Sequence, residues 1–305
     1  MLFFWLLVLA HGLADFILQT DRISAAKCKH KWQGYARHGL AVFICTFAAV
    51  HFYGWKSALL AAGLVTAAHV ALDWLKNIGR TLYAKILKRE ARPGVPGLLM
   101  DQSLHLLTLL WAWRLLDRPV DTAVAGFYAG VLAPLGQFSG AEKVVSGLAV
   151  YILVAFGGAV LIRFALDQVF PLGYIDGKQR KKLDKAPSPV ADEQGKELDI
   201  VPSSVADEQG KELDIVPNPV ADEQGKEVAA GKYIGILERI LILTLTVTGN
   251  ISAISVVFAA KSIARFSELS NKQFAEYYLV GTLLSFLLAL AGGMALVQIW
   301  ALISS

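Results

Sequence analysis

Long apolar segments separated by polar connections run through the chain. A helix needs about 20 apolar residues to cross a bilayer, within a range of about 17–25. Eight segments meet this requirement and predict membrane-spanning helices: 1–19, 38–55, 57–76, 98–116, 120–136, 145–166, 234–260 and 277–303. The segment 120–136 is short and contains Gly126, Gly130 and Pro134, so it could be re-entrant. We therefore predict an all-α, polytopic transmembrane bundle of about eight spans, with seven as the alternative.

The composition agrees with this pattern. The chain is 55% hydrophobic and 18% charged, and its mean hydropathy is +0.50, which is typical of polytopic membrane proteins. The excess of Lys and Arg (29) over Asp and Glu (25) is small, so membrane lipids rather than nucleic acids are the expected partners. Cys28 and Cys45 form neither a CxxC motif nor a disulfide framework.

Two short basic connections predict the orientation of the first four helices. The connections 20–37 and 76–97 carry many Lys and Arg but only one acidic residue each. Such loops remain in the cytoplasm of bacterial membrane proteins. We therefore expect the N-terminus outside, with a retained first span rather than a cleaved signal peptide.

A polar repeat divides the chain. Residues 172–231 contain a 15-residue repeat that begins at Ser188, Ser203 and Asn218. The repeat has too few apolar residues for a core and includes Pro in each copy, which predicts a disordered spacer. The alternative is a binding array, but the unit has no aromatic anchor. We therefore expect an N-terminal membrane domain at 1–171, a linker at 172–231 and a two-helix membrane segment at 232–305.

Histidine and aspartate recur in the first four predicted helices. Three pairs are separated by four residues, and residues four apart share one face of a helix. With alternating helix directions, the three Asp lie nearer the cytoplasm and the three His about one turn deeper. One more His opens the second span on the same side. The predicted site consists of His11, Asp15, His38, His69, Asp73, Asp101 and His105.

Burying these groups in a membrane is costly. An Asp at the centre of a membrane helix costs roughly 2.5–3.5 kcal/mol, so the three should face the bundle interior. Three interpretations follow. The cluster is a metal site for zinc, manganese or iron, a proton or ion pathway, or a set of interhelical hydrogen bonds worth about 0.6 kcal/mol each. Three aligned pairs favour the metal site.

Roles follow from this interpretation. His11, His69 and His105 are the first-choice ligands. Asp15, Asp73 and Asp101 are ligands or orienting groups, one of which could be a general base, and His38 is a fourth ligand or an acid–base group. The preferred function is a metal-dependent hydrolase at the membrane surface. The alternatives are a transporter or proton-coupled component, and a non-catalytic membrane scaffold.

The C-terminal helices carry a second, weaker polar set. Lys261 and Arg265 share a helix face at the predicted membrane edge. They either extend their charged ends to the interface and form ion pairs, or contact an anion or a lipid headgroup.

Several motifs resemble a known family. HGLADFILQTD (11–21), the isolated His38, HVALDWLK (69–76) and DQSLH (101–105) resemble the N-terminal signature of the uncharacterised bacterial integral membrane proteins catalogued as domain of unknown function 3307. GKYIGILERILIL (231–243), AAKSIARF (259–266) and EYYLVGTLLS (276–285) are similar to a block that accompanies it. The resemblance implies a bacterial inner-membrane location but no specific activity. The His/Asp pattern is similar to membrane metallohydrolases only by analogy.

Overall fold

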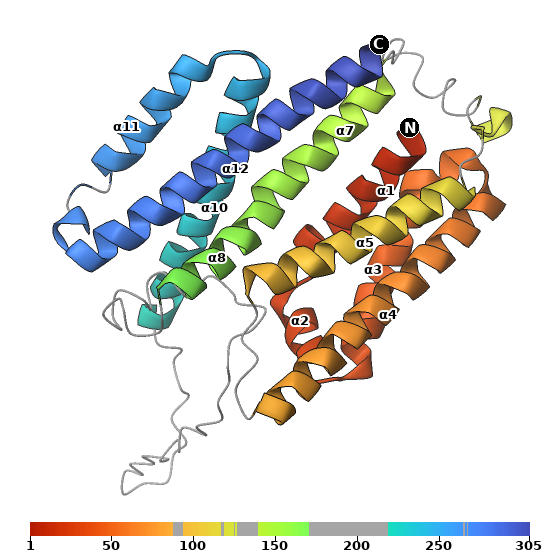
Figure 1. Ribbon diagram of the computed structural model, residues 1–305, viewed down its shortest axis with the longest axis horizontal. Coiled ribbons are helices and arrows are strands. Elements are labelled where there is room, and N and C mark those ends of the chain that lie inside the picture. Colours follow the sequence, from red (N-terminus) through yellow and green to blue (C-terminus); the bar gives the residue numbers. More distant parts are fainter. Residues whose placement is uncertain are drawn as a thin grey trace, which may run out of the picture.

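The computed structural model describes residues 1–87, 94–116, 119–124, 126, 140–170, 219–264, 266 and 268–305, with the backbone alone at 87, 219–232 and 268. Every regular element in these ranges is helical, which confirms the all-α prediction. The N-terminal helices are α1 (Leu2–Leu13), the π-helical turn η1 (Ala14–Leu18), α2 (Asp21–Cys28), α3 (Trp32–Val50), α4 (Trp55–Leu87) and α5 (Val95–Leu116). They form a bundle in which α2 lies across one end (Figure 1).

A sharp bend separates α1 from α2. Gln19 leaves the helical conformation, and the hydroxyl of Thr20 accepts a hydrogen bond from the Ile23 N–H as the cap of α2. The axes of the two helical segments differ by 90°. The segment 20–37, expected to be a loop, therefore contains α2 and the start of α3.

The remaining helices form the second half of the molecule. The helices α7 (Ala141–Ile152) and α8 (Gly158–Val169) are joined by the π-turn η4 (Leu153–Gly157) and lie between the N-terminal bundle and α12 (Lys272–Ser304) (Figure 1). The helix α10 (Pro219–Val247) lies against α12, and α11 (Ile254–Ala264) follows it. The helix α10 thus begins within the linker predicted at 172–231, and residues 172–218 of that linker lie outside the described ones.

The prediction of about eight spans is not supported. Among the described residues, three helices are long and apolar enough to cross a membrane: Trp55–Ile86, Ala141–Val169 and Lys272–Ser304. A fourth is added if the bent pair Leu2–Leu18 and Asp21–Cys28 counts as one span. Most of the predicted span 120–136 lies outside the described residues.

The predicted span 234–260 is a helical hairpin instead. The helix α10 ends at Val247, and Gly249 adopts φ 76°, a conformation that glycine reaches without strain. The N–H of Asn250 then bonds the carbonyl of Leu245 at 2.8 Å, which closes the helix end. The chain reverses there, so hydrophobicity alone could not distinguish two short helices from one long helix.

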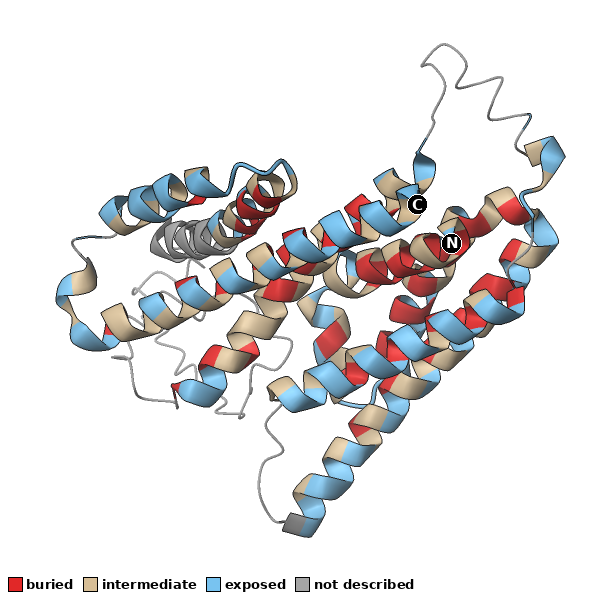
Figure 2. Ribbon diagram, turned by 45° about the horizontal axis from the view of Figure 1, so that its top comes forward, coloured by how far each residue is buried: buried red, intermediate tan, exposed pale blue. Residues whose placement is uncertain are grey.

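Two apolar clusters form the core. One consists of residues from α1, η1, α3, α4, α5 and α7 together with Tyr53, and the other of residues from α7, η4, α10, α11 and α12. Trp5 on α1 packs against both clusters and so connects the two halves. Buried residues lie on the helix faces that point into the bundle, whereas the C-terminal end of α4 is largely exposed (Figure 2).

The contact between α10 and α12 depends on a missing side chain. A Cβ added at Gly293 would lie 2.6 Å from the Cβ of Thr246, whereas one added at Gly63 on α4 would meet nothing within 4 Å. We expect Gly293→Ala to lower the free energy of unfolding by about 1–3 kcal/mol because the helices must separate. Gly63→Ala should leave it unchanged or raise it by up to about 1 kcal/mol. Denaturation of the purified protein in detergent measures both, and equal effects would contradict the close contact.

Candidate functional site

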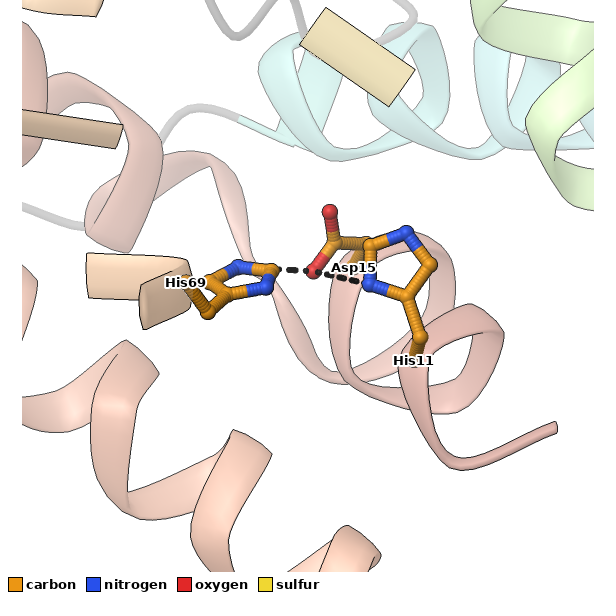
Figure 3. A group of neighbouring side chains, drawn as sticks. All are labelled: His11, Asp15 and His69. Carbon is orange, nitrogen blue, oxygen red and sulfur yellow. Dashed lines mark ion pairs between the residues drawn. The ribbon is translucent and has the colours of Figure 1, made fainter. Parts of the chain in front are cut away.

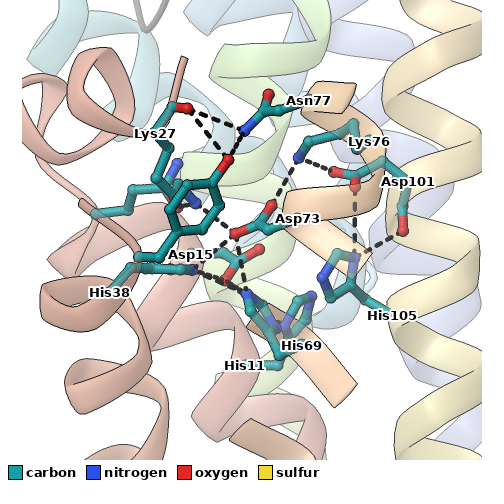
Figure 4. Close-up of polar contacts among 12 residues, drawn as sticks. His11, Asp15, Lys27, His38, His69, Asp73, Lys76, Asn77, Asp101 and His105 are labelled. Atoms are coloured by element: carbon teal, nitrogen blue, oxygen red, sulfur yellow. Dashed lines mark hydrogen bonds and ion pairs between the residues drawn. The ribbon is translucent and has the colours of Figure 1, made fainter. Parts of the chain in front are cut away.

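The seven predicted residues lie together inside the N-terminal bundle. His11 comes from α1, Asp15 from η1 and His38 from α3, while α4 and α5 contribute the two other His/Asp pairs. Six of the seven are buried, and the side chain of Asp15 is only 11% exposed. Figure 4 shows the carboxylates of Asp73 and Asp101 next to two lysines, whereas Asp15 lies among the imidazole rings.

Three ligand atoms converge at the centre. The Nε2 atoms of His38 and His69 lie 2.8 Å apart. Oδ1 of Asp15 lies 3.3 Å from the first nitrogen and 3.2 Å from the second. In a tetrahedral site with bonds of about 2.0–2.1 Å, ligand atoms lie about 3.4 Å apart. The three atoms therefore have nearly the spacing of ligands around one ion.

The polar atoms of this trio need a proton or a cation between them. Two imidazole nitrogens at 2.8 Å repel each other unless a proton or a metal ion lies between their lone pairs. Among the described residues, Nδ1 of His38 is buried without a hydrogen-bond partner, and the nearest polar atoms to Oδ1 of Asp15 are imidazole nitrogens. Buried polar atoms without a partner are rare and call for an explanation. A bound cation would supply one for the carboxylate.

The π-turn η1 places Asp15. It widens the end of α1, and such turns are common at functional sites. Asp15 points between the rings of His11 and His69 (Figure 3). Its Oδ1 lies 3.8 Å from Nδ1 of His11, farther than from the two central histidines. His11 is therefore a neighbour of the central trio rather than a member of it.

His105 also lies beside the trio. Its Nδ1–H donates to the carbonyl of Asp101 on its own helix at 2.8 Å, which leaves Nε2 as the atom that carries the lone pair. That Nε2 is buried without a hydrogen-bond partner among the described residues. The His105 ring lies 4.2 Å from that of His69, measured between centroids. Thus, of the three first-choice ligands, only His69 lies within the trio, and His38 is more central than expected.

Two lysines neutralise the other carboxylates. Nζ of Lys27 lies 2.5 Å from Oδ2 of Asp73, and Nζ of Lys76 lies 2.8 Å from Oδ1. Lys76 also reaches Oδ2 of Asp101 at 3.0 Å. Lys27 is only 5% exposed, so its ammonium ion is inside the protein and depends on these partners.

The sequence did not indicate these lysines as part of the site. Both lie in short basic segments, where Lys and Arg indicate membrane topology. Lys76 follows Asp73 by three residues, a spacing that places both on one helix face and could have revealed it. No local spacing relates Lys27 to the site, because α2 was not predicted. Gln102, whose Oε1 lies 3.2 Å from Nε2 of His11, was also missed.

Comparison with protein families now identifies this region. Residues 3–129 match the model described as "Protein of unknown function (DUF3307)". This part of the chain belongs to that family. The match includes all seven predicted site residues and both lysines, and the resemblance of 231–285 stays a prediction. Comparisons with curated proteins and with solved structures find no match.

A hydrogen-bonded group in the DUF3307 region holds Lys27 in place. The hydroxyl of Tyr35 donates to the backbone carbonyl of Lys27 at 3.2 Å. The side-chain amide of Asn77 donates to the Tyr35 oxygen at 2.8 Å and to the same carbonyl at 3.3 Å. The end of α2 is thereby attached to both α3 and α4, and Lys27 can extend inward to Asp73 (Figure 4).

Of the two residues in the C-terminal polar set, Lys261 and Arg265, the structure describes only Lys261. Lys261 pairs with Oε2 of Glu238 at 2.5 Å, and its ammonium lies 5.4 Å from the centroid of the Tyr278 ring. This pair joins the end of α11 to α10. Arg265 lies outside the described residues, so the anion or headgroup contact expected of the two together stays a prediction.

The pair of Lys27 and Asp73 can be tested by stability. We expect Lys27→Met to lower the free energy of unfolding by about 3–5 kcal/mol, because it leaves a buried carboxylate with one partner fewer. The double variant Lys27→Met/Asp73→Asn should recover part of that loss. Lys29→Met, an exposed change at the end of the same helix, should stay within about 0.5 kcal/mol of the original protein. Chemical denaturation in detergent checks all three, and equal losses for both lysines would contradict a buried ion pair.

Proposed function

We propose that this protein is a metal-dependent hydrolase that is embedded in the bacterial inner membrane as a multi-pass protein. One divalent ion, zinc, manganese or iron, would be held by His38, His69 and Asp15. The observation that carries this proposal is the convergence of two imidazole nitrogens and one carboxylate oxygen within 2.8–3.3 Å of one another. Nitrogen and oxygen ligands of this kind suit all three metals.

The local charge supports a cation. Three carboxylates meet two ammonium groups in the cluster, so one negative charge is unbalanced while the histidines are neutral. That charge belongs to Asp15, which no described lysine contacts. Burying a carboxylate without a counter-ion in a nonpolar interior costs roughly several kcal/mol of free energy, and a bound cation would offset this cost.

The distribution of charge favours one ion rather than two. Both oxygens of Asp73 and one oxygen of Asp101 are already bound by ammonium groups. Oδ2 of Asp73 lies 3.7 Å from Nε2 of His38 and 3.8 Å from Nε2 of His69, so it approaches the trio without joining it. Lys27 and Lys76 thus occupy positions where a second metal would need these carboxylates as ligands.

The surrounding residues can assist hydrolysis. An ion with three protein ligands would leave a coordination position for water and would lower the pKa of that water. Nε2 of His105 is buried without a hydrogen-bond partner among the described residues, so it can hold the proton that such chemistry releases. The side chain of Lys76 is 35% exposed, the most accessible charge of the cluster, and can attract an anionic substrate.

A proton or ion pathway is the second candidate. The chain of buried charges from Lys27 through Asp73 and Lys76 to Asp101 favours it, because proton relays use such groups. On the other side of the histidines, however, the bundle is filled by apolar residues, among them Phe3, Leu7 and Leu109, each only 1% exposed. A route across the membrane would have to pass this core. A non-catalytic scaffold is the third candidate.

Elemental analysis tests the metal site. We expect the intact protein to retain about one equivalent of zinc, manganese or iron per chain after purification in detergent. His38→Ala and His69→Ala should each release it, because each removes one of three ligands. His51→Ala is the matched control, since His51 lies at the far end of α3, where its Nδ1 bonds the carbonyl of Ala48, and should retain the metal.

The outcomes separate the candidates. A protein without metal contradicts the hydrolase and leaves the pathway and the scaffold. Two equivalents contradict the single-ion site. Bound metal together with hydrolysis of nitrophenyl esters or phosphates that His69→Ala and a chelator both abolish supports the full proposal, whereas metal without any hydrolysis in a broad ester panel contradicts the enzymatic part.

The two nearest carboxylates should differ in their effect on metal affinity. Asp15→Asn removes a direct ligand, so we expect almost complete loss of the ion. Asp73→Asn removes a neighbour of the ligands, and such changes weaken metal binding by about 10–100-fold. Competition with a chromogenic chelator measures both affinities. A greater loss from Asp73→Asn would show that Asp73, rather than Asp15, is the ligand.

A further inference from the structure

An apolar groove lies on the outside of the α3–α4 pair, away from the polar cluster. Its volume is about 760 Å³, and small side chains such as Ala36, Ala67 and Ala71 line it. At Gly39 the two helices approach closely, since an added Cβ would lie 3.0 Å from Cγ2 of Val70. The groove is an open hollow, present because these positions have little or no side chain.

Two tryptophans mark one end of the groove. The helices α3 and α4 are antiparallel, because Tyr35 contacts Asn77 while His38 contacts His69 farther along. Trp32 and Trp74 therefore lie toward the same end, and they are 74% and 53% exposed. Exposed tryptophans in membrane proteins gather at the level of the lipid headgroups.

The groove is long enough for one leaflet. Along α3 it runs from Trp32 to Phe43, about 16 Å at a rise of about 1.5 Å per residue. The hydrocarbon core of a bilayer is about 30 Å thick, so the groove reaches roughly to its middle. A spanning helix from a partner would need a face of nearly twice this length, whereas a lipid chain needs no more.

The tryptophan end is also basic. Lys29 and Lys31 are exposed immediately before Trp32 at the start of α3. This charge complements an anionic headgroup.

We infer that the groove between α3 and α4 binds an acyl chain of an anionic phospholipid, with its headgroup at Lys29 and Lys31 and the two tryptophans at the glycerol level. This site lies on the opposite face of the helix pair from the proposed metal ligands and does not depend on them. The lipid fills a hollow between α3 and α4, the two helices that supply His38 and His69.

Lipid retention tests this inference. The full-length protein is incorporated into nanodiscs that contain phosphatidylcholine and phosphatidylglycerol. The protein is then released, and the phospholipid that stays bound to it is measured by native mass spectrometry. We expect retained phosphatidylglycerol in the original protein. Ala67→Leu/Ala71→Leu fills the groove. It should lower lipid retention about tenfold or more, because the acyl chain loses the burial of about two methylene groups. Ala48→Leu, at an exposed position of α3 outside the groove, is the matched control and should change nothing.

A separate variant tests the basic end of the groove. Lys29→Gln/Lys31→Gln leaves the groove intact and should reduce the preference for phosphatidylglycerol over phosphatidylcholine about fivefold for each lysine. Equal retention by the groove-filling variant and the control overturns the inference, and so does a lipid preference that the lysine variant leaves unchanged. A dimer that the groove-filling variant converts to a monomer, without bound lipid, would assign the groove to a second copy of the chain.

Discussion

The N-terminal bundle depends on the compensation of charge inside an apolar interior. Asp73 accepts bonds from Lys27 and Lys76, and Lys76 extends the network to Asp101. Charges buried in this way are tolerated only where each has partners, so the helices that carry them must keep a fixed register. The network connects α2, α4 and α5, while the bundle's apolar residues fill the other side of the histidines. This arrangement confines polar chemistry to one end of the bundle.

The same compensation explains which carboxylate is available for a cation. The negative charges of Asp73 and Asp101 are neutralised by the ammonium groups of Lys27 and Lys76. Asp15 faces only imidazoles, which are neutral unless protonated. The difference comes from the backbone. Asp15 lies in the π-turn η1 and contacts the histidines, whereas Asp73 on α4 and Asp101 on α5 lie beside the lysines. Three chemically similar residues therefore have different charged neighbours, and composition alone does not reveal that difference.

Much of the site could be predicted from the sequence, because a spacing of four residues fixes a shared helix face. This rule placed His11 with Asp15, and it aligned the pairs on α4 and α5. It could not place Lys27, since that position depends on a 90° bend at Gln19 that has no hydrophobic signature. It also could not detect the reversal at Gly249, because a hairpin of two apolar helices has the hydropathy of one long helix. The hairpin removes one of the eight predicted spans, and most of another, 120–136, lies outside the described residues.

The C-terminal half supports the site from a distance through two π-turns. The turn η1, which carries Asp15, lies against η4, where a Cβ on Gly157 would sit 3.2 Å from the ring of Phe16. Arg239, 4% exposed, donates from Nε and Nη2 to the carbonyl of Ala155 in η4 at 3.0 and 2.7 Å. A π-turn breaks the regular helical hydrogen-bond ladder, and a guanidinium bound to this carbonyl stabilises the irregular segment. The position of Asp15 thus depends on a helix more than two hundred residues later in the chain, which joins the family region to the rest of the protein.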